Sequence, residues 1–485
     1  MTDWEAGMKA ANVNELKAAV NGCATVGDTV TVTNATAFRD GAIDRLVYNA
    51  VFGPSTEIRG TARWMIKSAG QSLGVWSASI QGLYEAMGRG EVKGYTVPAV
   101  NLRGLTYDVA RALIRAAKKN NAGTFIIEIA KSEIDYTFQR PAEYAVVMLA
   151  AAIKEGHQGP IFIQGDHFQI NAKKFHADRD KEVGAVRGLI TEAIRAGFYN
   201  IDIDTSTLVD LSKHNLAEEQ RLNFEIGAEL TKHVRSQEPK GVTVSVGGEI
   251  GEVGEKNSTV EELEAYMDGY NALVNKAGVK GISKVSVQTG TSHGGVPLPD
   301  GTIAKVALDF GTLEKLGALA RQKYHISGAV QHGASTLPDD LFDKFPAVNT
   351  SEIHLATGFQ NMIYESKYLP EALRAKIYKG LHDKFGDEKK PNMTEEQFIY
   401  KTRKKGFGLV KEELWTLPEA ARAGIGAEME AKFDFYIKKL GCAGNAKDVA
   451  AYIPKVMVAP DLKTEISDAA AWTPPAVTDT NPNAD

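Results

Sequence analysis

From residue 95 onward, short apolar and β-branched runs alternate with longer segments that have the apolar spacing of amphipathic helices. This alternation is typical of parallel strands joined by crossover helices. We predict eight strands, at Tyr95–Asn101, Thr124–Ala130, Pro160–Asp166, Asn200–Ser206, Thr243–Ile250, Lys284–Thr291, His325–His332 and Ser351–Thr357.

The segments between these runs are long enough to be crossover helices. Ser258 and Glu261 form a capping-box pattern at the start of one of them. Eight such units over roughly 270 residues match a closed (β/α)8 barrel, whereas an open doubly wound sheet would need fewer strands and an early glycine-rich nucleotide turn. We therefore expect an α/β fold, a (β/α)8 TIM barrel with additional helical segments at both ends. The predicted crossover helices include Thr106–Lys119, Glu182–Ala196, Glu218–Val234 and Val260–Ala277.

The segments on either side of the barrel are expected to be mainly helical. Residues 1–90 form a predicted N-terminal extension, in which Thr29–Thr33 fits a short strand equally well. The catalytic barrel is expected at residues 91–365 and a helical C-terminal extension at 366–470, with a capping pattern at Thr394 and Gln397. Residues 471–485, rich in Pro, Thr, Asn and Asp, are expected to be a disordered tail. The N-terminal helical patterns are Val13–Val20, Thr61–Ala69 and Ala78–Gly88.

Composition narrows the classes of function. The chain is 43% hydrophobic and 24% charged, which is typical of a globular protein with a large core. A net charge of −5, with both signs interspersed, gives no reason to expect nucleic acid or a membrane surface as partner. Cys23 and Cys442 are the only cysteines, which excludes a disulfide framework and a cysteine-based zinc finger. Since neither a signal peptide nor a membrane span is evident, we expect a cytoplasmic protein that acts on small molecules.

Six predicted strands end in charged, imidazole or amide side chains, which are costly at the end of a buried barrel strand unless they ligate, pair or catalyse. His167, His293 and His332 end strands three, six and seven, so they would meet at the carboxyl-end face of the barrel. Three nitrogen ligands and one open position make up a catalytic zinc site. A single strand-end histidine is more often a hydrogen-bonded structural residue, but three at matching depth favour a metal. The other histidines on helices or strand starts are expected to be structural or exposed: His157, His176, His214, His233, His325 and His382.

Several short motifs occur in an order that resembles one known family. Each motif alone is weak, but their order and spacing over residues 78–365 are similar to those of the class II, zinc-dependent fructose-bisphosphate and tagatose-bisphosphate aldolases. The resemblance implies a divergent member of that family with long N- and C-terminal extensions. The motifs are Val97–Asn101, Asp166–His167, Gly197–Phe198, Ile203–Ser206, the glutamate and glycine segment at 249–255, Gly290–Gly294 and His332–Ser335.

The resemblance implies a role for each matching polar residue. His167, His293 and His332 would be the zinc ligands. Asp166 matches the family's acid/base, which exchanges a proton with the hydroxyl at C4 of the substrate, and a loop or helix cap is the alternative.

Three further carboxylates match positions of the family. Asp204 and Glu249 match ligands of an alternative or second metal position, and partners that orient the histidines are the competing interpretation. Glu255 resembles the mobile-loop glutamate that removes a proton from the ketose donor, with a solvated loop charge as the alternative.

Phosphate recognition departs from the family pattern. His354 and Ala356 stand where the family has residues that touch the donor, and strand two has Glu128–Ser132 in place of a polar Gln-x-Ser. Lys131 would supply a cation for phosphate or carboxylate, or else face solvent. Hydroxyl and backbone donors that can surround a phosphate remain. The expected substrate-binding and phosphate-binding residues are Asn101, Gly294, Gly333, Ser335, Thr357 and Gly358.

Three functions fit this sequence. The first is a metal-dependent aldolase of a phosphorylated ketose, fructose 1,6-bisphosphate or a close relative. The second is a metal-dependent epimerase of a ketose or keto-uronate, which would invert C4 by retro-aldol chemistry, and the third is a non-catalytic partner subunit of an aldolase. The resemblance implies Zn²⁺ or another divalent metal, with a monovalent cation as an optional second ion, and a homodimer or homotetramer.

Overall fold

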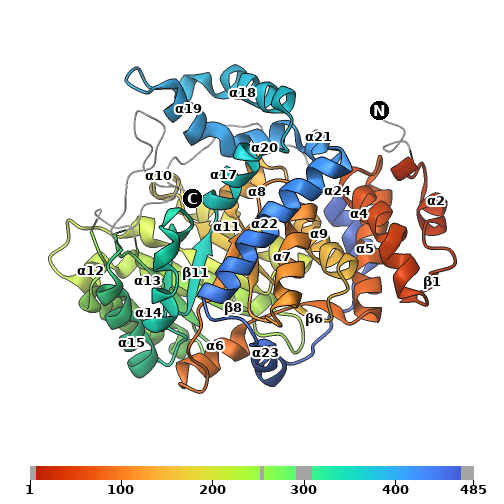
Figure 1. Ribbon diagram of the computed structural model, residues 1–485. Helices are drawn as coiled ribbons and strands as arrows, with labels where there is room; N and C mark the ends of the chain where they lie inside the picture. The colour runs from red at the N-terminus through yellow and green to blue at the C-terminus, as the bar shows by residue number, and fades with distance from the viewer. Residues whose placement is uncertain (1–6, 252–255, 291–307, 471–485) are drawn as a thin grey trace.

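The centre of the molecule is a closed barrel of eight parallel strands. The computed structural model describes residues 7–251, 256–290 and 308–470 (Figure 1). Each barrel strand pairs with the next along the chain, and the last pairs with the first. The predicted (β/α)8 TIM barrel is therefore confirmed. Its strands are β4 (Val97–Asn101), β5 (Ile126–Ala130), β6 (Gly159–Gln169), β7 (Asn200–Asp204), β8 (Ser245–Glu249), β9 (Lys284–Val287), β10 (Ala329–Gln331) and β11 (Glu352–Leu355).

All eight predicted strands occur, with different ends. β10 ends at Gln331, so His332 begins the following loop. β6 is longer than predicted because it continues beyond an irregularity in its pairing with β7 and adds Phe168 and Gln169 to the ladder. The carboxyl ends of the strands therefore hold most of the polar residues that the sequence singled out.

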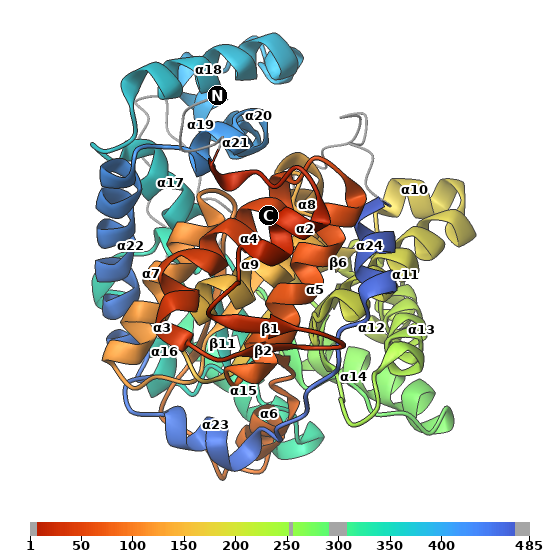
Figure 2. The ribbon, with the colours of Figure 1, turned by 90° about the vertical axis from the view of Figure 1, so that its right-hand side faces the viewer.

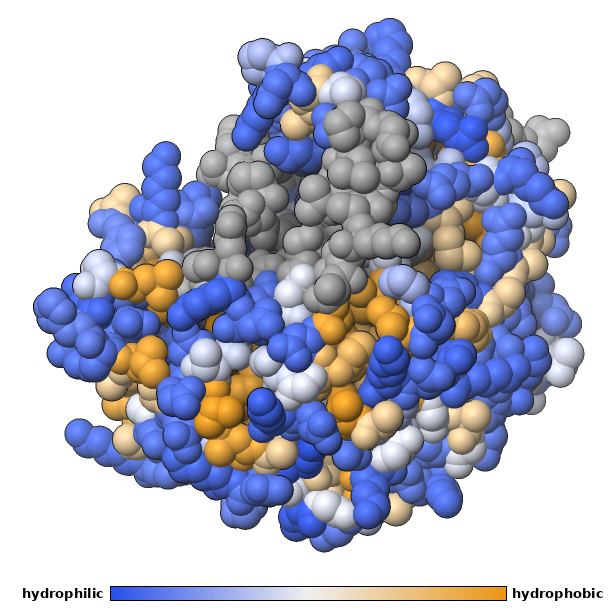
Figure 3. Space-filling model, turned by 60° about the vertical axis from the view of Figure 1, so that its left-hand side comes forward, coloured by the Kyte–Doolittle hydropathy of each residue, from blue (hydrophilic) through white to orange (hydrophobic). Residues whose placement is uncertain are grey.

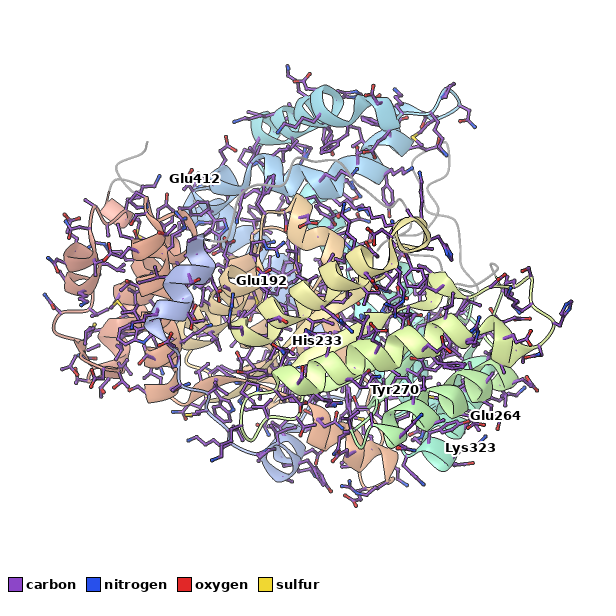
Figure 4. The ribbon with its side chains drawn as sticks, turned by 180° about the vertical axis from the view of Figure 1, so that it is seen from behind. Glu192, His233, Glu264, Tyr270, Lys323 and Glu412 are labelled. Atoms are coloured by element: carbon purple, nitrogen blue, oxygen red, sulfur yellow. The ribbon has the colours of Figure 1, made fainter. Side chains whose placement is uncertain are left out.

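Helices form a layer around the barrel (Figures 1 and 2). Polar contacts join neighbouring helices of this layer: Lys323 lies 2.9 Å from Glu264, and Tyr270 donates to Thr231 at 2.8 Å. Figure 4 shows three of these side chains, Glu264, Tyr270 and Lys323, on the back of the molecule. The layer includes α7 (Thr106–Lys119), α9 (Pro141–Lys154), α11 (Arg179–Ala196), α13 (Arg221–Gln237), α14 (Val260–Lys276), α15 (Phe310–Tyr324) and α17 (Thr357–Glu365).

One predicted helix cap is wrong by one residue and another is confirmed. Helix α14 begins with a capping box between Thr259 and Glu262, not Ser258 and Glu261. Ser258 instead accepts a hydrogen bond from the backbone N–H of Gln288 at 3.0 Å. Its hydroxyl therefore contacts the loop after β9 and does not cap the helix. The predicted cap of α19 (Glu395–Thr402) by Thr394 and Gln397 is confirmed.

The N-terminal segment is mainly helical but also contributes strands. The alternative interpretation of Thr29–Thr33 as a strand is correct, since β1 and β2 form a hairpin. The helix predicted from Ala78 begins only at Gln81, because β3 pairs in parallel with the amino-terminal half of β6 and extends the sheet below the barrel. The elements are α2 (Val13–Ala18), β1 (Ala24–Val26), β2 (Val30–Val32), α4 (Ile43–Phe52), α5 (Thr56–Ser72), β3 (Val75–Ala78) and α6 (Gln81–Gly88).

The C-terminal segment is helical, as predicted, and returns along the barrel to the N-terminal helices. Figure 2 shows α24 beside α5, where Lys67 contacts Glu465 at 2.5 Å. The limits of the separate segments stay a prediction, and the predicted tail at 471–485 lies outside the described residues. The helices are α18 (Glu371–Phe385), α19, α20 (Gly406–Leu409), α21 (Lys411–Trp415), α22 (Glu419–Lys439), α23 (Ala446–Tyr452) and α24 (Leu462–Ala470).

The face shown in Figure 3 is mainly hydrophilic, with hydrophobic residues in separate small patches. Among the described residues, the exposed large apolar side chains are Leu211, Tyr368, Val458 and Leu462. None of the helices in the described ranges has the length and apolar character needed to cross a lipid bilayer.

Candidate active site at the barrel mouth

A bulge in strand β6 aims two neighbouring side chains into the barrel mouth. The pairing of β6 with β7 shifts between Gly165 and Phe168, and His167 has a left-handed backbone with φ 40°. This conformation is uncommon and strained for a residue with a Cβ, and such strain clusters at functional sites. In a regular strand Asp166 and His167 would point to opposite faces. The bulge lets both lie buried at the mouth.

Two of the three predicted histidine ligands meet at the mouth. The ring centroids of His167 and His332 lie 4.3 Å apart. Donor atoms of His167, Glu249 and His332 all lie within 4.8 Å of one another, and all three residues are buried. Two imidazoles and one carboxylate are a known ligand set of catalytic zinc. These three residues could therefore hold a divalent metal ion.

Asp166 lies among three imidazoles. Its Oδ1 is 3.8 Å from Nε2 of His167, 3.5 Å from Nε2 of His332 and 3.3 Å from Nδ1 of His354. Burial opposes the charged form of Asp166, but the charges of His167 and His354 outweigh it and hold its pKa well below the usual value. Asp166 is therefore a carboxylate at neutral pH, the form that accepts a proton.

The two histidines of the donor cluster have opposite electrostatic surroundings. Burial and the neighbouring imidazoles of His354 and His167 keep the pKa of His332 well below its usual value. Burial acts the same way on His167, but Asp166, Asp204 and Glu249 raise its pKa well above the usual value. A neutral imidazole is the form that binds a metal, so His332 could ligate one as it stands, whereas His167 would first have to lose a proton.

Asp204 lies behind His167 rather than within the donor cluster. Its Oδ2 is 3.3 Å from Nδ1 of His167 and accepts from Gln169 at 2.6 Å, while its Oδ1 accepts from the backbone and hydroxyl of Ser206. This placement favours the interpretation of Asp204 as a residue that orients His167. Glu249 by contrast is a member of the cluster, with Oε2 3.7 Å from Nδ1 of His332.

The predicted substrate residues that the structure describes lie on one side of the mouth. Asn101, Gly333, Ser335 and Thr357 line a small cavity of about 20 Å³ together with Asp166 and His332. Gly358 is next to it and donates its backbone N–H to the hydroxyl of Ser335 at 3.0 Å. The predicted residues Glu255, His293 and Gly294 lie outside the described residues.

A buried ionic network below the mouth was not predicted. Lys284 lies 2.5 Å from Glu352 and 3.0 Å from Asp202, and Nε2 of His354 lies 2.7 Å from Glu352. Glu128 is 3.1 Å from Nδ1 of His354, and burial together with Asp166 raises the pKa of Glu128 to about 7. The sequence contains a signal for this network, since Glu352 and His354 alternate on one strand and so share its inner face.

The sequence left the roles of His354 and Lys131 undecided, and the structure shows where each side chain lies. The imidazole of His354 lies inside the mouth, and its ring centroid is 4.0 Å from that of His332. Lys131 is not one of the described residues that line the cavity, and its ammonium donates to the backbone of Gln169 at 2.7 Å and lies 3.4 Å from Glu182. Arg103, which follows β4, lines the cavity instead.

The closed parallel barrel and the donor cluster at its carboxyl-end mouth are features of a (β/α)8-barrel enzyme. The sequence profile of class II fructose-bisphosphate aldolases matches residues 83–413. The chain therefore belongs to the class II fructose-bisphosphate aldolase family, an aldolase-type lyase family. The predicted resemblance is confirmed. A search of curated proteins finds no match.

Solved structures share the fold at low sequence identity. The fructuronate-tagaturonate epimerase UxaE from Cohnella laeviribosi aligns with a TM-score of 0.52 and 11% identity, over 79% of this chain and 86% of that one. A probable tagatose 6 phosphate kinase from Sinorhizobium meliloti 1021 gives 0.50 and 17%, over 77% and 97%. A putative fructose-1,6-biphosphate aldolase from Coccidioides immitis gives 0.45 and 17%, over 75% and 97%. At these identities the likeness concerns the fold alone.

Proposed function

We propose that this protein is a metal-dependent class II aldolase. It reversibly cleaves a phosphorylated ketose, fructose 1,6-bisphosphate or a close relative, to dihydroxyacetone phosphate and an aldehyde. The observation that carries the proposal is the convergence of His167, Glu249 and His332 beside Asp166, in a chain of the class II aldolase family.

The donor set fits Zn²⁺ or another divalent metal. His167, Glu249 and His332 supply two nitrogen ligands and one oxygen ligand, and His293 is the further ligand that the sequence predicts. A divalent cation bound there would polarise the substrate carbonyl and stabilise the negative charge that develops when the carbon–carbon bond breaks. Asp204 would keep His167 in its ligating orientation.

The acid and base roles follow from position and charge. In the cleavage direction Asp166 takes the proton of the C4 hydroxyl, and its low pKa keeps it ionised for that step. Glu255 then delivers a proton to the three-carbon donor, a role that rests on the sequence motif. Synthesis uses the same two residues in reverse.

The test is release of dihydroxyacetone phosphate from fructose 1,6-bisphosphate, followed with a coupled NADH-consuming enzyme, together with the metal content of the protein. We expect about one divalent ion per chain and activity that a chelator abolishes. Asp166→Asn should lower kcat by about 10²–10⁴-fold while metal content is kept. As a matched control, Asp268→Asn, an exposed residue of α14 that contacts Lys323 at 3.3 Å on the outer helix layer, should keep its activity. Activity that survives both the chelator and Asp166→Asn would refute the mechanism.

A second candidate is a metal-dependent epimerase of a ketose or keto-uronate. The observation that favours it is His354, whose imidazole lies inside the mouth at a position where the family has a residue that contacts the donor. An epimerase would break and re-form the same bond without releasing a triose. Interconversion of two ketoses without dihydroxyacetone phosphate would support this candidate, and an inactive, metal-free protein would support a non-catalytic partner subunit.

We also propose a homodimer or homotetramer, in line with the family resemblance. Light scattering coupled to gel filtration measures the mass directly, and a particle of 52.4 kDa would be a monomer and would refute this prediction.

A further inference from the structure

We propose that Arg103 recognises an oxyanion of the substrate, a phosphate or a carboxylate, and so determines substrate specificity. The inference rests on the proposed function only in taking the barrel mouth as the substrate site. Arg103 lies just beyond the end of β4 and is 4% exposed. Its side chain lines the cavity that also contains Ser335 and Thr357.

Arg103 is held in one orientation by buried acceptors. Its Nε lies 2.7 Å from Oε1 of Glu133, and its Nη1 donates to Gln360 at 2.9 Å. Oε2 of Glu133 also accepts from the side chain of Asn101 at 2.6 Å and from the backbone of Ala130 at 2.7 Å. A guanidinium whose position is fixed in this way is preorganised for a ligand and loses little entropy when the ligand binds.

The loop that carries Arg103 is itself supported by the C-terminal segment. A Cβ added at Gly104 would lie 2.3 Å from the ring of Phe407, so the two segments are in close contact. Helix α17, which carries Gln360, is held from its other side, where Arg403 donates to Asn361 at 2.6 Å. The position of Arg103 is therefore fixed by parts of the chain that are far apart in sequence.

The polar groups of the cavity are divided between two sides. The donors Ser335, Thr357 and Arg103 lie just after the neighbouring strands β10, β11 and β4. The carboxylates come from the next two strands, with Glu128 on β5 and Asp166 on β6. An anion can therefore bind on the donor side while the reacting carbons lie near Asp166.

Arg103 supplies the positive charge that this donor side needs. Of the described residues that line the cavity, it is the single arginine or lysine. Thr357 is the first residue of α17, so the positive end of that helix faces the same side. Arginine binds phosphate and carboxylate through several N–H donors in one plane, which hydroxyl groups cannot replace.

The experiment measures anion binding without turnover. Isothermal titration calorimetry of the metal-loaded protein measures the affinity for inorganic phosphate and, in a separate titration, for glycolate. Inorganic phosphate is the probe for a phosphate group and glycolate the probe for a carboxylate. We expect wild type to bind at least one of them, and Arg103→Gln to weaken that binding at least tenfold. Arg103→Lys keeps the charge but not the planar set of N–H donors, so its affinity for the anion should lie between those of wild type and Arg103→Gln. Arg115→Gln is the matched control, because Arg115 is bound to Glu155 and Glu430 on the outside of α7 and should leave binding unchanged.

A double variant separates binding from folding. Arg103→Gln alone leaves Glu133 as a buried charge without its arginine, and that charge can unfold the chain. Arg103→Gln with Glu133→Gln removes both charges and should fold, yet bind the anion at least tenfold more weakly than wild type. Binding equal to wild type in the double variant, or no binding of either anion by wild type, would overturn the inference. If the double variant loses anion binding and wild type releases no triose, the result would support the role of Arg103 in anion binding and refute the proposed aldolase activity.

Discussion

Lys284 offers a sharp test of how burial changes the strength of an ion pair. Its ammonium lies 2.5 Å from Glu352 inside the barrel, with side-chain exposures of 1% and 0%. Lys280, four positions earlier, also lies 2.5 Å from a glutamate, Glu85, but the exposures are 50% and 36%. The two lysine–glutamate pairs have the same distance but differ in their access to water, and Lys284 also lies 3.0 Å from Asp202.

The expected destabilisation differs several-fold between the two sites. Lys284→Met removes the buried ammonium from Glu352 and Asp202 and leaves His354 as their remaining cationic partner, and breaking a buried pair in this way costs about 3–5 kcal/mol of the free energy of unfolding. Lys280→Met removes a pair that water and salt already screen, which costs about 0–1 kcal/mol. Burial raises the pKa of Asp202 to about 6 even with Lys284 in place, so the free energy needed to charge this site is large.

Urea unfolding at pH 7.5, followed by circular dichroism, measures both variants. The difference between wild type and Lys284→Met should shrink as the pH falls. Although burial works against it, Lys284 lowers the pKa of Glu352 below its usual value, so the stabilising contribution of this carboxylate is present at neutral pH and is lost in acid. Equal losses for the two methionine variants at pH 7.5, or a gap that widens in acid, would refute the reasoning.

Three further predictions concern single residues. His167→Gly should be more stable than His167→Ala by about 1 kcal/mol in urea unfolding, because φ is 40° there and glycine adopts this backbone without strain; the opposite order would show that the bulge is unstrained. Burial lowers the pKa of His157 to about 4, whereas in the unfolded chain this imidazole takes a proton near pH 6.5. The free energy of unfolding of wild type should therefore fall by about 2 kcal/mol between pH 7 and pH 5, and His157→Gln should lose that part of the pH dependence. Gly60→Ala should lower the melting temperature, because a Cβ there would lie 2.4 Å from the backbone of Ile466, whereas Gly184→Ala, in open space on α11, should not.

The barrel could be predicted because its signal is local. Each strand is a short apolar run, and each crossover helix has its own period, so their alternation is visible without knowledge of contacts. β3 was missed because its four residues lie next to a helix pattern, and the partner that makes them a strand is β6, far along the chain.

The site was predictable only in part, since a strand end shows which residues face the mouth but not which ones touch. His167 and His332 meet as predicted, whereas the separate positions of Asp204 and Glu249 depend on the bulge in β6 and on the local register. Arg103 was missed because its function depends on Glu133 and Gln360, which the fold brings to it from other elements. Pairwise contacts of this kind have no periodic signature in a single sequence.

The contact between α5 and α24 has a consequence for synthesis on the ribosome. Lys67 and Glu465 are 398 residues apart. At about 5–20 residues per second, translation leaves the face of α5 that α24 covers in the folded protein open for on the order of 20–80 s. During that interval the ammonium of Lys67 has no Glu465 to contact, and chaperones can bind the uncovered face of α5.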